Sequence, residues 1–327
     1  MNRSHLRLPA IVLGLALPLL ATSSASASVA GAHSLQIPPG ARTNGLGQAG
    51  VALADDATSA WWNPAGLGFM RGQTLGFMHS QLVPDLADDI YYEYGGWVHQ
   101  LEGWGTYSVS LIYLSYGESV KTTDSPESEG TFRSFEFSPA LAYGVRLDDN
   151  TSIGLGLKYV RVDLAPVTAV PDFNRDGAGS SVAVDLGFLR RLGHHLTFGA
   201  ALTNFGPNIS FINEEQSDPM PRHVKLGLAW TPYQSEYGHL LLTGDFNKMI
   251  VSGGPTIGNG GFEAQYQQIM ALRMGYVHDP DGDITDFTFG GGFHVPLAGR
   301  DFFLDYASVP QASDLDRVHR FSFEILF

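Results

Sequence analysis

The sequence predicts an all-β protein, a 14-stranded antiparallel transmembrane β-barrel with an amino-terminal hatch segment inside its lumen. Three observations lead to this prediction. Apolar residues recur at every second position from Gly72 onward, long and short connections alternate between these segments, and the chain ends on Phe327. Alternation with period two is typical of strands with one apolar face, and alternating long loops and short turns are typical of outer-membrane barrels.

Residues 1–27 carry the three parts of an export signal. Arg3 and Arg7 provide a positive start, Leu8 to Leu20 form a short apolar run, and Ala25-Ser26-Ala27 supplies small residues for cleavage. A second site of this kind is Ala30-Gly31-Ala32. The apolar run is too short for a transmembrane helix, so we expect it to be a signal peptide.

Composition narrows the class of protein further. The full chain has a formal net charge of −14, and loss of the two arginines of the export signal makes it −16, which argues against nucleic acid as a partner. No cysteine is present, so disulfides and thiolate metal sites are excluded. Thirty-nine glycines and 12% aromatic residues, beside only 16% charged residues, suit a barrel that faces lipid.

Fourteen strands are expected after the hatch. Their ranges are 73–82, 89–100, 104–116, 132–147, 150–163, 179–192, 195–206, 221–231, 238–247, 261–266, 269–277, 285–295, 301–309 and 317–327. An even number lets the barrel close without a free edge. Whether Gly261 to Val277 is one strand or two stays open, and one strand would make the count odd.

The longer connections are expected to face the cell exterior and the short turns the periplasm. A short turn is Asp148-Asp149, and the long polar loops are Glu118 to Thr131, Ala165 to Ala178, Pro207 to Met220 and Met249 to Gly260.

Residues 28–71 do not alternate and precede a barrel expected over residues 72–327. They are rich in Gly, Ala and Pro, and small residues allow irregular backbone to pack closely. Because irregular backbone at membrane depth must be buried in protein or face water, the lumen is the expected place for this hatch. The hatch motif consists of Gly45, Gly47, Gly50, Asp55, Asp56, Asn63, Pro64, Ala65 and Gly66.

Charged residues alternate with the apolar face of several strands and should point into the lumen. They are Lys158, Asp185, Lys225, Asp245, Arg273 and Asp305. Such charges can pair with one another and with the hatch, or line a polar permeation path. We expect Arg273 to anchor the hatch through Asp55 or Asp56.

Other motifs in the sequence match known signatures only in part. Gly45-Leu46-Gly47-Gln48-Ala49-Gly50 matches the dinucleotide fingerprint but follows no buried strand, so a packed turn is expected and no cofactor. Asp172, Asn174 and Asp176 begin like a calcium loop, but alanine stands where the closing glutamate belongs, and Asp and Gly are ordinary turn residues. No other metal site is expected. Without a Gly-x-Ser-x-Gly or His-Glu-x-x-His motif we expect no catalytic residues and no enzyme.

The last strand places Phe321, Phe323, Ile325 and Phe327 on one face. This ending resembles the signal by which outer-membrane barrels are recognised for insertion. The resemblance implies the outer membrane as location, and outer-membrane lipid and the barrel-assembly machinery as partners.

Two stretches carry a family resemblance. Gly45 to Gly68 resembles the hatch of the long-chain fatty acid transporter (FadL-like) superfamily. Ala271 to the end resembles its PorV/PorQ family, through Ala271 to Tyr276, Gly290 to Phe293, Leu304 to Ala307 and His319 to Ser322, and Thr203 to Pro207 is a further match.

The resemblance implies a fourteen-stranded outer-membrane barrel with an internal hatch. It also implies a role as accessory factor in type IX-like secretion, with a secreted protein or translocon subunit as partner. The wider superfamily implies the alternative, transport of a hydrophobic small-molecule ligand. A barrel with a structural role alone is a third reading.

Overall fold

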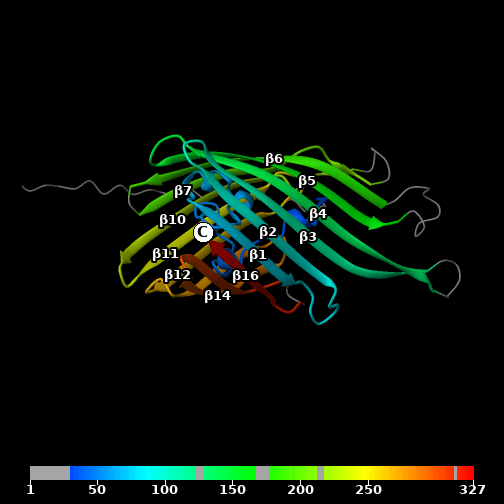
Figure 1. The fold of residues 1–327 in the computed structure, drawn as a ribbon. Coiled ribbons are helices and arrows are strands. Elements are labelled where there is room, and N and C mark those ends of the chain that lie inside the picture. The colour runs from blue at the N-terminus through cyan, green and yellow to red at the C-terminus, as the bar shows by residue number, and fades with distance from the viewer. Residues whose placement is uncertain (1–29, 123–127, 167–176, 194, 212–216, 313–314) are drawn as a thin grey trace, which may run out of the picture.

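The computed structural model describes residues 30–122, 128–166, 177–193, 195–211, 217–312 and 315–327. Fourteen antiparallel strands form one closed barrel, in which β1 pairs with β16 and β7 with β10 (Figure 1). The strands of the barrel are β1 (Gln73–Gln81), β2 (Ile90–Leu101), β3 (Gly105–Thr122), β4 (Ser128–Arg146), β5 (Thr151–Ala165), β6 (Gly177–Leu192), β7 (Leu196–Phe205), β10 (His223–Ser235), β11 (Gly238–Met249), β12 (Thr256–Tyr266), β13 (Met270–Asp279), β14 (Ile284–Leu297), β15 (Arg300–Val309) and β16 (Val318–Leu326). The predicted fold class and strand number are confirmed, and residues 261–277 divide into β12 and β13.

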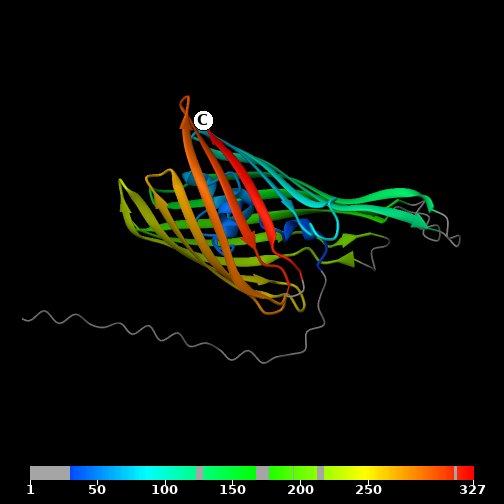
Figure 2. The ribbon, with the colours of Figure 1, turned by 90° about the horizontal axis from the view of Figure 1, so that it is seen from below.

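The strands differ in length around the barrel. β1 and β16 have nine residues each, whereas β3 has 18 and β4 has 19. Because about 9–11 residues suffice to cross a bilayer, the β3–β4 and β5–β6 hairpins extend beyond the others on the long-loop side (Figure 2). The predicted loop Glu118 to Thr131 is therefore wrong, since β3 and β4 occupy most of it. In this extension the alternation of exposed and buried residues that identifies a membrane strand stops, because Glu118, Ser119 and Val120 are all exposed.

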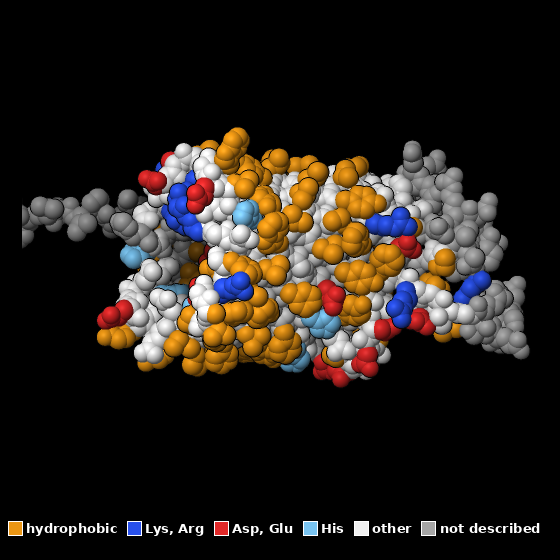
Figure 3. Space-filling model, viewed as in Figure 1, with side chains coloured by type: hydrophobic (Ala, Val, Ile, Leu, Met, Phe, Trp, Pro, Cys, Tyr) orange, Lys and Arg blue, Asp and Glu red, His pale blue; other side chains and the backbone are white. Residues whose placement is uncertain are grey.

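The outer surface carries a broad apolar band (Figure 3). Leu155, Leu186, Leu228 and Phe289 project from it, each with about half of its surface exposed. The apolar residues of β16 belong to this band, because Phe321, Phe323 and Phe327 are exposed while Arg320 is buried in the lumen. The band is where lipid contacts the barrel.

Replacing Leu157 with arginine should destabilise the barrel by about 2–4 kcal/mol, because this outward side chain of β5 lies near the middle of the apolar band. Leu164→Arg, near the far end of the same strand, should cost about 1 kcal/mol or less. Urea unfolding in lipid vesicles measures both. Equal losses would mean that the membrane boundary lies elsewhere on β5.

Residues 30–71 fold inside the barrel, as Figure 2 shows for the blue segment. This described part of the hatch contains η1 (His33–Leu35), α1 (Ala41–Gly45), α2 (Ser59–Trp62) and η2 (Pro64–Phe69). None of the helices in the described ranges is long and apolar enough to cross a membrane. The predicted signal peptide lies outside the described residues.

A segment between β7 and β10 also folds into the lumen, which the sequence did not predict. It contains the two short paired strands β8 (Ile209–Ser210) and β9 (Ser217–Asp218). Ile209 and Met220 are fully buried in an apolar cluster with Leu35 of the hatch and Val160 of the wall. At its described ends, this segment therefore packs inside the barrel and covers the hatch from the extracellular side.

Candidate functional site: the hatch and the surrounding lumen

Glycines of the hatch and of the barrel wall let the two backbones approach each other. A Cβ on Gly275 would lie 1.9 Å from the Gly47 nitrogen, and one on Gly261 would lie 2.3 Å from the Leu46 oxygen. Gly47 itself has a φ of +68°, a conformation that favours glycine. Thr288 completes this contact, since the Gly47 amide donates to its hydroxyl at 2.9 Å and the hydroxyl donates to Gly45 at 3.0 Å.

The end of the hatch motif packs in the same way against β4, β5 and β6. A Cβ on Gly154 would lie 2.2 Å from the Pro64 carbonyl carbon, and one on Gly187 would lie 2.3 Å from the Asn63 amide oxygen. The Asn63 side chain donates to Val51 within the hatch at 2.9 Å and to Phe188 of the wall at 3.0 Å. Ser152 donates to the Ala65 carbonyl at 2.6 Å. The predicted Asn63, Pro64 and Ala65 therefore hold the hatch to the wall.

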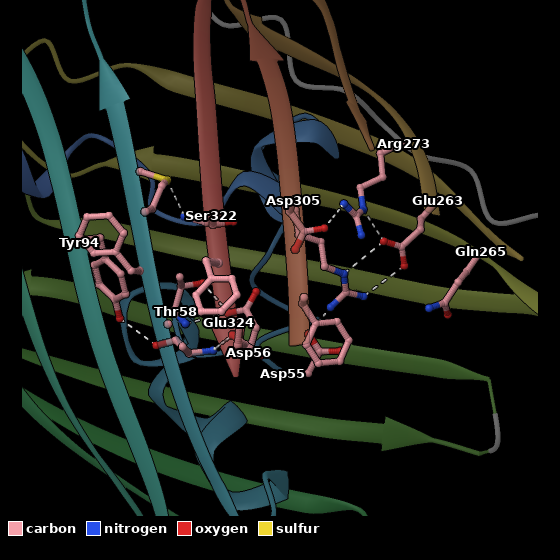
Figure 4. A pocket seen from close by; sticks show the side chains of 18 of the residues that line it. Asp55, Asp56, Thr58, Tyr94, Glu263, Gln265, Arg273, Asp305, Ser322 and Glu324 are labelled. Atoms are coloured by element: carbon pink, nitrogen blue, oxygen red, sulfur yellow. Dashed lines mark hydrogen bonds and ion pairs between the residues drawn. The ribbon is translucent and has the colours of Figure 1, made fainter. Parts of the chain in front are cut away.

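A network of charged side chains joins the other side of the hatch to β12, β13 and β15 (Figure 4). Glu263, with 2% of its side chain exposed, accepts from Arg273 at 2.6 Å and from Arg42 of the hatch at 3.2 Å. Arg42 also pairs with Asp55 at 2.7 Å, and Arg273 with Asp305 at 2.5 Å.

The expected pairing of Arg273 with Asp55 or Asp56 is wrong. Arg273 is already held between two carboxylates of the wall, and the hatch contributes the cation, Arg42, rather than the anion. Arg42 was missed because the hatch has no periodicity that would show which residues face the wall. Glu263 was missed although it alternates with the outward-facing Phe262 in β12.

The last strand also binds the hatch through its inward face. The Ala57 amide donates to Glu324 at 2.7 Å, the Ala41 amide donates to Ser322 at 3.1 Å, and Arg320 donates to the Asn44 side chain at 2.5 Å. β16 thus turns aromatic residues to the lipid and polar residues to the hatch.

Asp56 does not form the ion pair with Arg273 that the sequence led us to expect. Its carboxylate accepts from the Thr58 amide at 2.8 Å and from the Thr58 hydroxyl at 2.5 Å, which fixes a turn of the hatch. Burial and the neighbouring Asp55 raise the pKa of this carboxyl above its usual range. Because the folded state favours the protonated form, the contribution of Asp56 to stability is greatest at low pH and declines as the pH rises through the shifted pKa.

The remaining predicted lumen charges all lie on the buried inner face. Lys158 pairs with Asp185 at 2.7 Å and donates to Asn204 at 2.8 Å, which ties β5, β6 and β7 together. Asp245 accepts from the Val51 amide of the hatch at 2.9 Å. The Lys225 ammonium lies 4.1 Å from the ring centre of Trp61 in the hatch.

A buried carboxylate marks the extracellular end of the hatch. Glu136, 1% exposed, accepts from the amides of His33 and Ser34 at 3.0 and 2.8 Å, and from the Tyr116 hydroxyl at 2.5 Å. The Gly31 amide donates to Pro219 at 3.0 Å. These contacts and the apolar cluster join the hatch to the wall and to the segment between β7 and β10 at this end of the lumen.

Two cavities border the hatch on its other side. One, of about 250 Å³, lies among the charged residues of Figure 4. The other, of about 470 Å³, lies at the end of the short turns, between the hatch and the wall. The described residues contain no cluster of side chains suited to a metal ion. The calcium candidate, Asp172, Asn174 and Asp176, lies outside them.

The barrel is similar to solved structures of outer-membrane transporters. For the toluene transporter TbuX of Ralstonia pickettii the TM-score is 0.60 with 11% identity, over 88% of this chain and 97% of that one. For the toluene transporter TodX of Pseudomonas putida it is 0.57 with 15% identity, over 88% and 96%. For a FadL homologue of Pseudomonas aeruginosa it is 0.55 with 11% identity, over 88% and 97%. At these identities the likeness shows the fold alone.

The closed barrel with its irregular segment in the lumen has the same fold as these solved structures. The family model of the type IX secretion system protein PorV matches residues 22–256. The chain therefore belongs to the PorV family, and is an outer-membrane barrel associated with type IX secretion. No protein in a search of curated proteins matches it.

Proposed function

We propose that this barrel acts as an accessory factor for secretion and surface delivery of other proteins, without catalysing a reaction. It would bind a secreted protein or a translocon subunit at its extracellular end, after export directed by residues 1–27 and insertion by the barrel-assembly machinery. The extension of β3–β6 beyond the apolar band is the observation that supports this proposal most directly.

The extended β3–β4 hairpin is suited to contact another protein. Paired strands hold its backbone in place, so that little conformational freedom is lost on binding. Val120 is 59% exposed, and the Arg133 and Glu118 side chains form an exposed pair at 3.4 Å. An apolar side chain beside charged groups is typical of a protein-binding surface. The segment Pro207 to Met220 is less suited, because Ile209 and Met220 are buried.

The hatch inside the lumen also favours a binding role over a pore. The apolar cluster packs residues of the hatch against the wall, and the Arg42–Glu263 pair holds the hatch to the wall. A protein that escorts others needs a stable scaffold in the membrane, and an internal hatch stiffens the barrel.

Replacing residues 118–131 with a short Gly-Ser turn should abolish surface delivery while the barrel still assembles. Mass spectrometry of the culture medium and of the cell surface measures delivery, and heat-modifiable gel mobility measures assembly. The control replaces residues 280–283, the β13–β14 connection. Normal delivery by the shortened β3–β4 hairpin would refute a role for this hairpin.

Import of a hydrophobic small molecule is the second candidate function. It is favoured by the fold likeness to TbuX and TodX, which are described as toluene transporters. A deletion strain that no longer grows on toluene or on a long-chain fatty acid, with protein secretion intact, would support import and contradict the first proposal.

A further inference from the structure

Three arginines surround the end of the lumen that carries the short turns, which in outer-membrane barrels faces the periplasm. Arg71 follows the hatch directly, and Arg146 and Arg191 end the inward faces of β4 and β6. Arg146 and Arg71 are electrostatic neighbours of Arg191, and so is Asp55, whose carboxylate is paired with Arg42. No carboxylate of the described residues lies within 4.0 Å of any of these three side chains in an ion pair.

The hatch holds one of these arginines in position. The Arg191 guanidinium lies 4.0 Å from the ring centre of Phe69, at the end of η2. Stacking on an aromatic ring orients a guanidinium and leaves its N–H groups free to donate at the edge. An acidic protein with net charge −14 thus gathers at one opening three arginines that form no ion pair with a carboxylate of the described residues.

The cavity of about 470 Å³ begins at this opening. Arg71 and Arg191 line it together with the apolar side chains of Leu53, Phe69 and Leu241. Two carboxylates also line it, but Asp55 is bound to Arg42, and Glu324 accepts from the Ala57 amide. An amide hydrogen bond does not neutralise Glu324, so the charged groups of the cavity without an ion-pair partner among the described residues are Arg71 and Arg191 against Glu324. The balance is positive, and the walls of the cavity are partly apolar.

We propose that this periplasmic cavity binds an acidic segment of a periplasmic protein, with carboxylates on Arg71 and Arg191 and an apolar side chain against Leu53 and Phe69. Arg146 does not line the cavity but adds positive charge beside Arg191. Guanidiniums bind carboxylates in a bidentate manner, which provides both affinity and orientation. The occupant is a protein segment rather than lipid, because the cavity lies inside the ring of strands. Arg190, which alternates with Arg191 and points outward, is the residue placed to meet a lipid headgroup.

The test uses the full-length barrel in nanodiscs of zwitterionic lipid and a fluorescent synthetic peptide of alternating glutamate and leucine. We expect saturable binding that weakens as salt increases. The double variant Arg71→Gln/Arg191→Gln should bind about tenfold more weakly or worse. Arg190→Gln is the matched control at the same strand end and should bind like the wild type.

Several outcomes would overturn the proposal. These are absence of saturable binding to the wild type, equal binding by the double variant, and loss of peptide binding when anionic lipid is added to the nanodiscs, which would indicate a lipid site. If the double variant fails to assemble, the test is instead made on the wild type, by measuring its binding of a peptide of alternating lysine and leucine. It should not bind, and equal binding by both peptides would show that the arginines play no part.

Discussion

Replacing Glu263 with glutamine should destabilise the folded protein by about 3 kcal/mol. The substitution keeps the size of the side chain but removes the negative charge that Arg42 and Arg273 share in a buried position. Loss of one partner leaves charge buried without full compensation, which costs far more than loss of an exposed pair. Because Arg42 belongs to the hatch, we also expect the hatch to leave the wall intermittently.

Urea unfolding in vesicles measures the loss of stability, and planar-bilayer recording detects openings of the lumen. Asp286→Asn is the matched control, since it removes the exposed ion pair with Arg317 at 2.9 Å and should cost less than about 1 kcal/mol. If both variants lose the same small amount, the buried network does not hold the hatch.

Replacing Gly154 with alanine should displace the hatch from β4, β5 and β6. The added methyl group would lie 2.2 Å from the Pro64 carbonyl carbon, a distance that no rotation of a side chain can relieve, because both atoms are tied to the backbone. Overpacking of this kind costs about 1–3 kcal/mol. The expected result is a folded barrel of lower stability that conducts ions more than the wild type.

Gly95→Ala is the control for this substitution. Gly95 is also a strand glycine, in β2, but nothing lies within 4 Å of its added methyl group. The two variants are compared by planar-bilayer conductance and by urea unfolding. If the Gly154→Ala barrel has the same conductance and the same stability to urea as the Gly95→Ala barrel, the wall glycines do not determine the position of the hatch.

Alternation in the sequence was sufficient to predict the barrel. Because the outer face of the barrel contacts lipid and the inner face lines a polar lumen, neighbouring residues of a strand must alternate between apolar and polar. Strands such as β13 and β16 can therefore be recognised from the spacing of their apolar residues alone. The same alternation placed Lys158, Asp185 and Asp245 correctly on the inner face. It could not say which groups they bind, because partners such as Asn204 and Val51 come from other elements.

The irregular parts were harder to predict for a physical reason. Arg42, Ile209 and Met220 lie in segments without period, where the side chain's direction depends on contacts made only after the barrel closes. The extension of β3 and β4 was missed because strands that leave the membrane lose their apolar face. Residues that are buried only by contacts with distant parts of the chain leave no recognisable pattern in the neighbouring sequence.

We expect this plugged barrel to bind a protein partner rather than a small molecule. Native mass spectrometry of the protein, extracted gently from its own outer membrane, tests it most directly. We expect a complex with a secreted protein or a translocon subunit that is lost when residues 118–131 are shortened. A barrel without protein partner that carries an acyl or hydrocarbon mass, after detergent is excluded, would contradict the account.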